Sequence, residues 1–224
     1  MPETESTLHE ALLALKETAP IEHAECALCK LVARSVMRSI QTLAAEFVND
    51  PQTRINLRES RGFCSEHSQL ILENLDPVAV SIIYADLADM TCDRWSGMRK
   101  STLTSRRLFG ASARVALCPL CVTAREASLR YCGALASELS NSVVWNAIKS
   151  NNWICISHAW LLQKLAIPAD SNRLRTLETE HLTTLQGELE EIIRKNDYRF
   201  RGEKWGSEKD AWIRAVNKLR RPED

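Results

Sequence analysis

Apolar residues recur along this chain every three or four positions, the spacing of one face of an α-helix. The clearest series consists of Leu28, Val32, Val36, Ile40, Leu43 and Phe47. Asp50-Pro51 and Asp76-Pro77 each offer an N-cap followed by a proline at the first helical position. The pattern predicts a helix from about residue 27, a short one over 51–60, and two more from residues 65 and 77.

The second half shows the same kind of pattern. It predicts helices around 129–139, 143–149, 156–165 and 174–192, and a last helix from Ser207. Three sets of residues are expected on buried helix faces: Val78, Ile82, Ile83, Leu87 and Met90; Leu129, Cys132, Leu135 and Leu139; and Trp212, Val216 and Leu219.

Composition supports an all-α fold. The 224 residues include only 7 Gly and 7 Pro, too few for the many turns of a β-sandwich or barrel. The 29 basic and 29 acidic side chains cancel, so no net charge draws the chain to nucleic acid. Apolar runs are shorter than the roughly 20 residues that span a bilayer, and the acidic start does not resemble a signal peptide. We therefore expect a soluble, cytoplasmic protein without a membrane contact.

Cysteine and histidine spacing reveals an internal repeat. C-x-x-C and C-x-x-H pairs each occur twice, and the second copies follow the first at offsets of 92 and 91 positions. The pairs are Cys26/Cys29, Cys64/His67, Cys118/Cys121 and Cys155/His158. The pattern indicates a tandem duplication of a roughly four-helix unit. We expect one half at 1–100, comprising an N-terminal helix and the first repeat, and another at 101–224, comprising a basic linker, the second repeat and a C-terminal helix; both halves could share one compact domain.

The pairs have the chemistry of metal ligands. Residues three apart lie on one face of a helix, so each pair can grip one ion. We expect a helical hairpin to unite the two pairs of each repeat, giving one Cys3His site from Cys26, Cys29, Cys64 and His67 and a twin from Cys118, Cys121, Cys155 and His158. Such closed sites suit structural zinc, two ions per chain. A [4Fe–4S] cluster is the alternative cofactor.

Other candidate residues are discounted. Cys92 and Cys132 match no ligand pair, and His23 is interpreted as a surface residue. Glu178 and His181 have the spacing of a di-iron motif that would need a second copy. The basic segment 94–114 is interpreted as a linker, with nucleic-acid contact as the minority interpretation.

At these motifs the chain resembles an uncharacterised family of bacterial helical proteins that contain a domain of unknown function. The shared features are C-x-x-C, the G-F-C-x-x-H of residues 62–67, and a tail in which Asp197-Tyr198-Arg199-Phe200-Arg201 leads to Asp210-Ala211-Trp212. At the second site Trp153-Ile154 replaces the Gly-Phe turn. The resemblance implies an architecture and no activity.

The sequence therefore predicts a non-enzymatic, metal-stabilised helical protein that acts as a binding or regulatory module with an unknown protein partner. The alternatives are an iron–sulfur redox or sensor protein and, less favoured, a thiol oxidoreductase that uses one C-x-x-C pair.

Overall fold

The computed structural model describes residues 2–17, 26–47, 50–100, 116–150, 154–200 and 202–220. Within these ranges all regular structure is helical and no strand occurs, so the prediction of an all-α protein is confirmed. The chain forms two compact units whose boundaries differ from the halves expected from sequence. Unit 1 combines residues 1–32 with 127–224, and unit 2 consists of residues 33–126.

Unit 2 is built mainly from one continuous stretch of helices. Its elements are the rest of α2 (Ala27–Thr42), the π-helical turn η2 (Leu43–Phe47), α3 (Pro51–Ser60), α4 (Ser65–Asn74), α5 (Pro77–Lys100) and the first turns of α6 (Pro119–Ser137). Asp50 caps α3 as predicted, because its carboxylate accepts a 2.7 Å hydrogen bond from the backbone N–H of Thr53.

A left-handed turn directs the chain from α3 into α4. Arg61 has φ 61° and Gly62 has φ 99°, backbone conformations that end α3 and reverse the chain before Cys64. Gly62 is required here, because a side chain at that φ would be strained and its Cβ would lie 3.2 Å from Leu87.

The core of unit 2 comes from the expected apolar faces with one exception. Buried residues from α2, α3, α4, α5 and α6 pack together, among them Val36, Ile40, Leu57, Ile71, Ile83, Leu87 and Leu120. Val78 was expected among them, but it is 67% exposed and Ala79 is buried instead. The prediction for Val78 was wrong because the inner face of α5 consists of Ala79, Ile83 and Leu87, which follow one another at intervals of four residues. Val78 lies outside this face.

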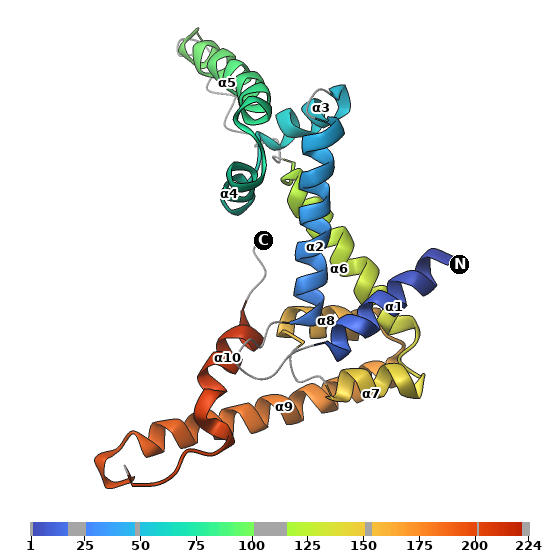
Figure 1. Ribbon diagram of the computed structural model, residues 1–224, viewed down its shortest axis with the longest axis vertical. Helices are drawn as coiled ribbons and strands as arrows, with labels where there is room; N and C mark the ends of the chain where they lie inside the picture. The colour runs from blue at the N-terminus through green and yellow to red at the C-terminus, as the bar shows by residue number, and fades with distance from the viewer. Residues whose placement is uncertain are drawn as a thin grey trace. The chain divides into compact units, whose positions relative to one another are not determined.

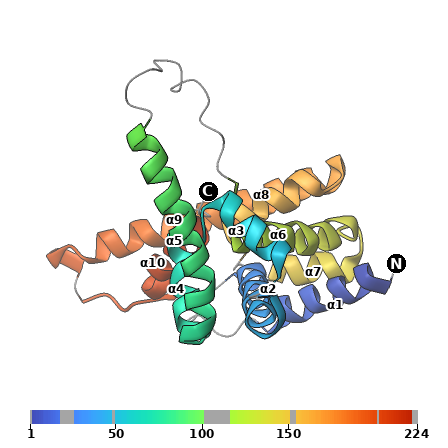
Figure 2. The same cartoon turned by 90° about the horizontal axis from the view of Figure 1, so that it is seen from above.

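Unit 1 gathers helices from both ends of the chain (Figure 1). They are α1 (Pro2–Lys16), the first turns of α2, most of α6, α7 (Ser142–Ser150), α8 (Ile156–Leu165), α9 (Pro168–Lys195) and α10 (Ala211–Leu219), with the 3₁₀ turns η3 (Tyr198–Phe200) and η4 (Ser207–Asp210). Helix α1 packs beside α7, as Figure 2 also shows, and α9 contacts α8 and α10.

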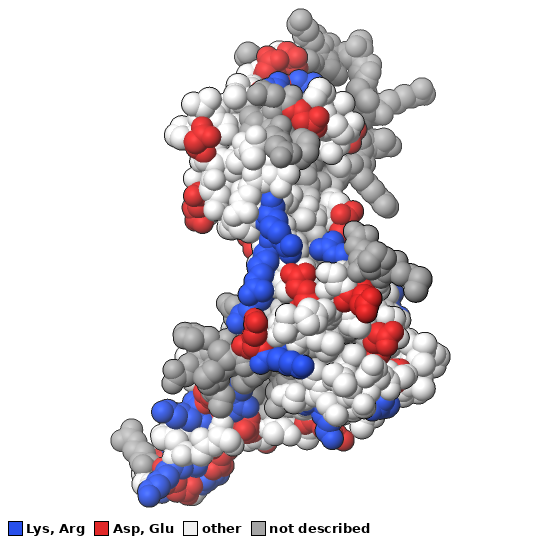
Figure 3. All heavy atoms as spheres, turned by 45° about the vertical axis from the view of Figure 1, so that its right-hand side comes forward, with Lys and Arg blue, Asp and Glu red and all other residues white. Residues whose placement is uncertain are grey.

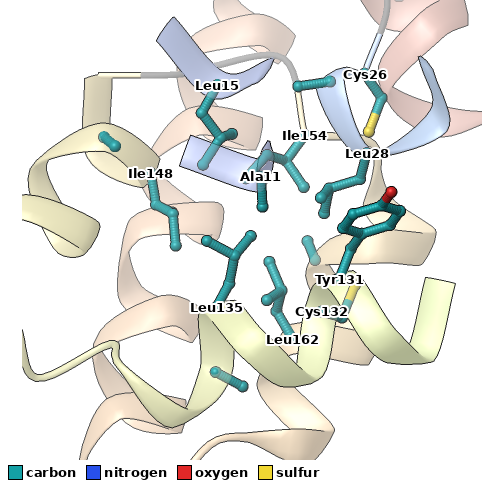
Figure 4. Packing of buried hydrophobic residues seen from close by; sticks show 14 of the residues in the cluster. Ala11, Leu15, Cys26, Leu28, Tyr131, Cys132, Leu135, Ile148, Ile154 and Leu162 are labelled. Atoms are coloured by element: carbon teal, nitrogen blue, oxygen red, sulfur yellow. The ribbon is translucent and has the colours of Figure 1, made fainter. Parts of the chain in front are cut away.

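The core of unit 1 joins segments that are distant in sequence (Figure 4). Side chains from six helices meet there, including Ala11, Leu28, Leu135, Ile148, Leu162 and Leu174. Cys26 and Cys132 belong to the same cluster. Leu129 was expected to be buried with Leu135, but it is 42% exposed, because Ala127 and Tyr131 take the buried positions around it.

The last helix contradicts its predicted orientation. Helix α10 begins at Ala211, after the 3₁₀ turn that starts at Ser207. Trp212, Val216 and Leu219 are 58%, 68% and 52% exposed, whereas Lys218 is 6% exposed. The prediction of an inward apolar face was wrong because ion pairs, described below, hold the polar face inward.

Helices in the two halves of the chain begin at matching intervals. The starts of α3, α4 and α5 precede those of α7, α8 and α9 by 91 positions, and α2 precedes α6 by 92. Cys64 and Cys155 both adopt extended backbone conformations at the N-caps of their helices. The helices therefore follow the spacing of the sequence motifs.

The described surface carries charges of both signs. Figure 3 shows acidic and basic side chains mixed on the face that it displays. Among the described helices, none combines the length and the apolar character needed to cross a bilayer.

Candidate metal sites

The eight predicted ligands form two clusters, each within one unit. Unit 1 holds Cys26, Cys29, Cys155 and His158, and unit 2 holds Cys64, His67, Cys118 and Cys121. In each cluster one potential ligand atom from every residue lies within 4.8 Å of the others. We call the clusters site 1 and site 2. Both are Cys3His sets, as predicted.

The predicted pairing of motifs was wrong. Each C-x-x-C pair was expected to meet the C-x-x-H pair of its own half of the chain, but each meets the one from the other half. The reason is helix length. The stretch from α2 through η2 covers about 20 residues and rises about 30 Å, whereas α3, with ten residues, can recover only about half of that distance. Helices α6 and α7 have the same mismatch, so the hairpins cannot close on themselves.

Every ligand pair occupies the start of a helix. Cys26 and Cys118 directly precede α2 and α6, and Cys64 and Cys155 are the N-caps of α4 and α8. The second ligand of each pair follows three positions later, in the first turn and on the same side. Two helix N-termini therefore converge on each site. Their partial positive charges stabilise the thiolates that a metal ion requires.

The spacing of the donor atoms in site 1 fits one tetrahedral ion. The Sγ atoms of Cys29 and Cys155 are 3.7 Å apart. The Nδ1 atom of His158 lies 3.5 Å from the Sγ of Cys26, 3.5 Å from that of Cys29 and 3.2 Å from that of Cys155. Zinc bonds of usual length at tetrahedral angles would separate two sulfurs by about 3.8 Å and a sulfur and a nitrogen by about 3.6 Å.

Site 2 has the same geometry. The Sγ atoms of Cys64 and Cys121 are 3.6 Å apart. The Nδ1 atom of His67 lies 3.1 Å from the Sγ of Cys64, 3.7 Å from that of Cys118 and 3.3 Å from that of Cys121. Cys118 and His67 are buried, and Cys64 and Cys121 are half-buried. Burial raises the pKa of the Cys121 thiol to about 12, with further contributions from Cys64 and Cys118.

The pKa values in site 1 shift in opposite directions: that of Cys155 is lowered, and those of Cys26 and His158 are raised. Hydrogen bonds from Cys26 and Cys29 lower the pKa of Cys155, whereas hydrogen bonds to Cys155 and Cys29 raise that of Cys26. Burial opposes a charge on His158, but its contacts with Cys155 and Cys29 raise its pKa to about 9. A bound cation would replace the proton on this imidazole, because metals bind neutral histidine and deprotonated cysteine.

Three residues outside the motifs support site 1. The Oγ of Ser128 lies 3.2 Å from the Nε2 of His158 and can fix the orientation of the imidazole ring. The Lys218 ammonium donates a 2.7 Å hydrogen bond to the carbonyl of Ile154, the residue before Cys155. The Cys29 thiol beside the Arg220 guanidinium raises the pKa of the arginine.

Sequence reasoning missed these three supporting residues. Ser128 supports site 1, but in the sequence it lies seven positions after Cys121, which belongs to site 2. No local spacing therefore marks Ser128 as a neighbour of His158. Lys218 and Arg220 lie in the last helical segment, where the apolar residues predicted that the opposite face of α10 is the buried one. Only the position of Cys155 beside α10 reveals their role.

The residues discounted in the sequence are not ligands in these sites. Cys132 is buried in the core of unit 1, where burial raises its pKa to about 12, and Cys92 is exposed. His181 and Glu178 are 4.0 Å apart, and Glu178 is also paired with Lys218. His23 and most of the basic segment 94–114 lie outside the described residues.

The fold and the sites together define an all-α protein with two candidate Cys3His metal sites. Family comparison agrees with the resemblance seen in the motifs. The chain belongs to a family described as a family of unknown function (DUF6062), which matches residues 15–224. No curated protein and no solved structure matches the chain.

Proposed function

We propose that this protein is a non-enzymatic, metal-stabilised helical protein that carries one zinc ion in each Cys3His site and serves as a binding or regulatory module. The observation that carries the proposal is the closure of both sites. Four protein donors converge in each unit, all within 4.8 Å of one another. A tetrahedral zinc ion would find no open position for substrate or water, which is the hallmark of a structural site.

The donor spacing favours a single ion over the iron–sulfur alternative. In a four-iron cluster each ligand binds a different iron atom, so its ligands surround a body of several atoms. Sulfur atoms 3.6 and 3.7 Å apart fit the edges of one tetrahedron instead. Zinc is the ion that cysteine-rich tetrahedral sites with one histidine usually hold.

The state of the thiols argues against a thiol oxidoreductase. Such an enzyme needs an accessible cysteine with a low pKa. Cys26, the first residue of its C-x-x-C pair, is 2% exposed, and its contacts with Cys155 and Cys29, together with burial, raise its pKa well above the usual value. In the other pair, Cys118 is 7% exposed and Cys121 has a pKa of about 12.

A structural ion would contribute directly to folding. Site 1 joins segments 126 positions apart, and site 2 joins segments 57 positions apart. Each cross-link would restrict the unfolded chain, and structural zinc sites in small domains supply on the order of 10 kcal/mol of folding free energy. We also propose a cytoplasmic location, where cysteine ligands stay reduced.

We also propose that the chain arose by duplication of a four-helix unit, followed by an exchange of partners. The matching intervals between helix starts and the shared N-cap geometry of Cys64 and Cys155 support this origin. In this view each repeat contributes a C-x-x-C pair to one site and a C-x-x-H pair to the other.

The test is elemental analysis and absorption spectroscopy of protein purified without oxygen. We expect about two zinc ions per chain, a colourless solution and a loss of helix content when a strong chelator removes the metal. A brown protein with absorption near 400 nm that bleaches in air would overturn the proposal in favour of an iron–sulfur cluster. A folded protein without metal would overturn both.

A further inference from the structure

The C-terminal helix α10 is oriented with its apolar side outward. Trp212, Val216 and Leu219 lie one helical turn apart along one face, and each is more than half exposed. Ala211 and Lys218 are its buried residues. Hydrophobic burial favours the reverse orientation, so other contacts must hold the helix in place.

Ion pairs on the inner face supply those contacts. The buried Lys218 ammonium lies 2.5 Å from a carboxylate oxygen of Glu178 in α9. Arg214 lies 2.6 Å from Glu188, also in α9, and 3.0 Å from Asp210. The arginine side chain is 18% exposed and that of Glu188 15%, so water screens this pair little. Two charge pairs thus fasten α10 to α9.

The end of α10 is also fastened to both segments of site 1. Besides Glu178, the Lys218 ammonium binds the carbonyl of Ile154, directly before Cys155. One residue after the helix, the backbone carbonyl of Arg220 accepts a 3.5 Å hydrogen bond from Ser157 in α8. The side chain of Arg220 reaches Cys29 at the start of α2.

These contacts depend on how the two segments of site 1 are held together. Cys29 and Cys155 belong to segments that are 126 positions apart, and both segments supply partners to the last turn of α10. Without an ion, thiol and imidazole hydrogen bonds join the ligands of this site, and apolar packing in the core of unit 1 joins the segments around them. If the segments separate, Lys218 and Arg220 cannot keep both sets of partners.

We propose that the metal ion of site 1 supports α10, through Ile154 and Cys29, in the orientation that exposes Trp212, Val216 and Leu219. Loss of that ion loosens the last turn of α10, which then depends on its ion pairs with α9 alone, so the apolar face is held firmly in this orientation only in the metal-bound protein. The ligands of site 2 belong to unit 2, whereas α10 and its partners belong to unit 1, so the proposal concerns the ion of site 1. The inference rests on the proposed occupation of the sites by metal.

The test compares hydrogen exchange of the α10 amides in full-length variants. Cys155→Ser and Cys64→Ser are matched, because each removes the N-cap cysteine of a C-x-x-H pair, one in site 1 and one in site 2. We expect each variant to lose one zinc ion per chain. Exchange in residues 211–219 should become at least tenfold faster in Cys155→Ser and remain unchanged in Cys64→Ser.

The outcomes separate this inference from the proposed function. Wild-type protein that is folded without metal contradicts the function. A Cys155→Ser protein that loses its zinc while α10 exchanges at the wild-type rate overturns the inference, and so does equal acceleration in both variants.

A second variant keeps the test valid if Cys155→Ser fails to fold. Lys218→Met combined with Arg220→Met leaves all eight ligands in place. We expect wild-type exchange rates in α4 of unit 2, which neither residue contacts in the described structure, while α10 exchanges at least tenfold faster. Unchanged exchange in α10 would show that these contacts do not hold the helix and would overturn the inference.

Discussion

The Sγ of Cys29 lies 3.7 Å from the Sγ of Cys155, although 126 positions separate the two residues. This contact joins the C-x-x-C pair of the first half to the C-x-x-H pair of the second. The reciprocal contact, between Cys64 and Cys121, measures 3.6 Å. Each site therefore depends on both halves of the sequence. The loss of one candidate ligand should change the reactivity of cysteines that are distant in sequence.

Removal of Cys155 should expose Cys26 and Cys29 to alkylation and leave Cys64 and Cys121 protected. The reason is that the first two thiols belong to the same candidate metal site as Cys155, whereas the others belong to the second site. Mass spectrometry of Cys155→Ser after treatment with a thiol reagent gives the reactive positions. Cys64→Ser is the reciprocal control. Reactivity of Cys118 and Cys121 in Cys155→Ser would mean that the motifs pair within each repeat after all.

Ser128→Ala should weaken metal binding at site 1 by about 10- to 100-fold, the usual effect of removing the partner of a ligating histidine. The Ser128 hydroxyl lies 3.2 Å from the Nε2 of His158, opposite the nitrogen that faces the cysteines. Competition with a chromogenic chelator measures the affinity. Ser137→Ala is the control, because the Ser137 hydroxyl binds only the Ala134 carbonyl of its own helix. Equal affinity in both variants would contradict the prediction.

Two glycine substitutions should have opposite effects on stability. Gly62→Ala should destabilise the protein by about 1–2 kcal/mol, because Gly62 has φ 99° and a Cβ would lie 3.2 Å from Leu87. Gly133→Ala should stabilise it by about 0.5–1 kcal/mol, since Gly133 is inside α6 and a Cβ would meet nothing within 4 Å. Urea unfolding measures both. A shift of the same sign in the two variants would refute the backbone argument.

Leu135→Ala should cost about 2–5 kcal/mol of unfolding free energy, because Leu135 is fully buried in the core of unit 1. Leu129→Ala should cost less than about 1 kcal/mol, since Leu129 is 42% exposed on the same helix. Equilibrium unfolding of the metal-loaded variants provides the comparison. A larger loss of stability for Leu129→Ala would support the prediction from sequence that Leu129 lies on the buried face of its helix.

Glu208→Gln should destabilise the protein at neutral pH and have little effect in strong acid. The backbone N–H of Gly206 and the ammonium of Lys195 lower the pKa of Glu208 to about 2, from an ordinary value of 4.5. The stabilisation is therefore complete above about pH 4.5 and disappears as the pH falls towards 2. The difference in unfolding free energy between wild type and variant should shrink over this range. A difference independent of pH would show that the carboxylate charge is not its source.

Interactions between residues that are close in sequence made several helix caps, turns and helix bounds predictable. Asp50 caps α3, Gly62 forms the turn before Cys64, and α4 and α8 span the predicted residues. These features depend on a few adjacent residues, whose backbone preferences are expressed in any context. The eight residues of the two Cys/His clusters were likewise singled out as candidate ligands, because a spacing of three residues brings two side chains to one face of any helix.

Tertiary structure decided which ligands meet and which helix faces are buried. The partners of Cys29 depend on the lengths of α2 and α3, since a short helix cannot return the chain past a longer one. The orientation of α10 depends on Glu178, Glu188 and Ile154, which are remote in sequence from that helix. Residue spacing defines which side chains share a face, but only the packed neighbours determine where that face points.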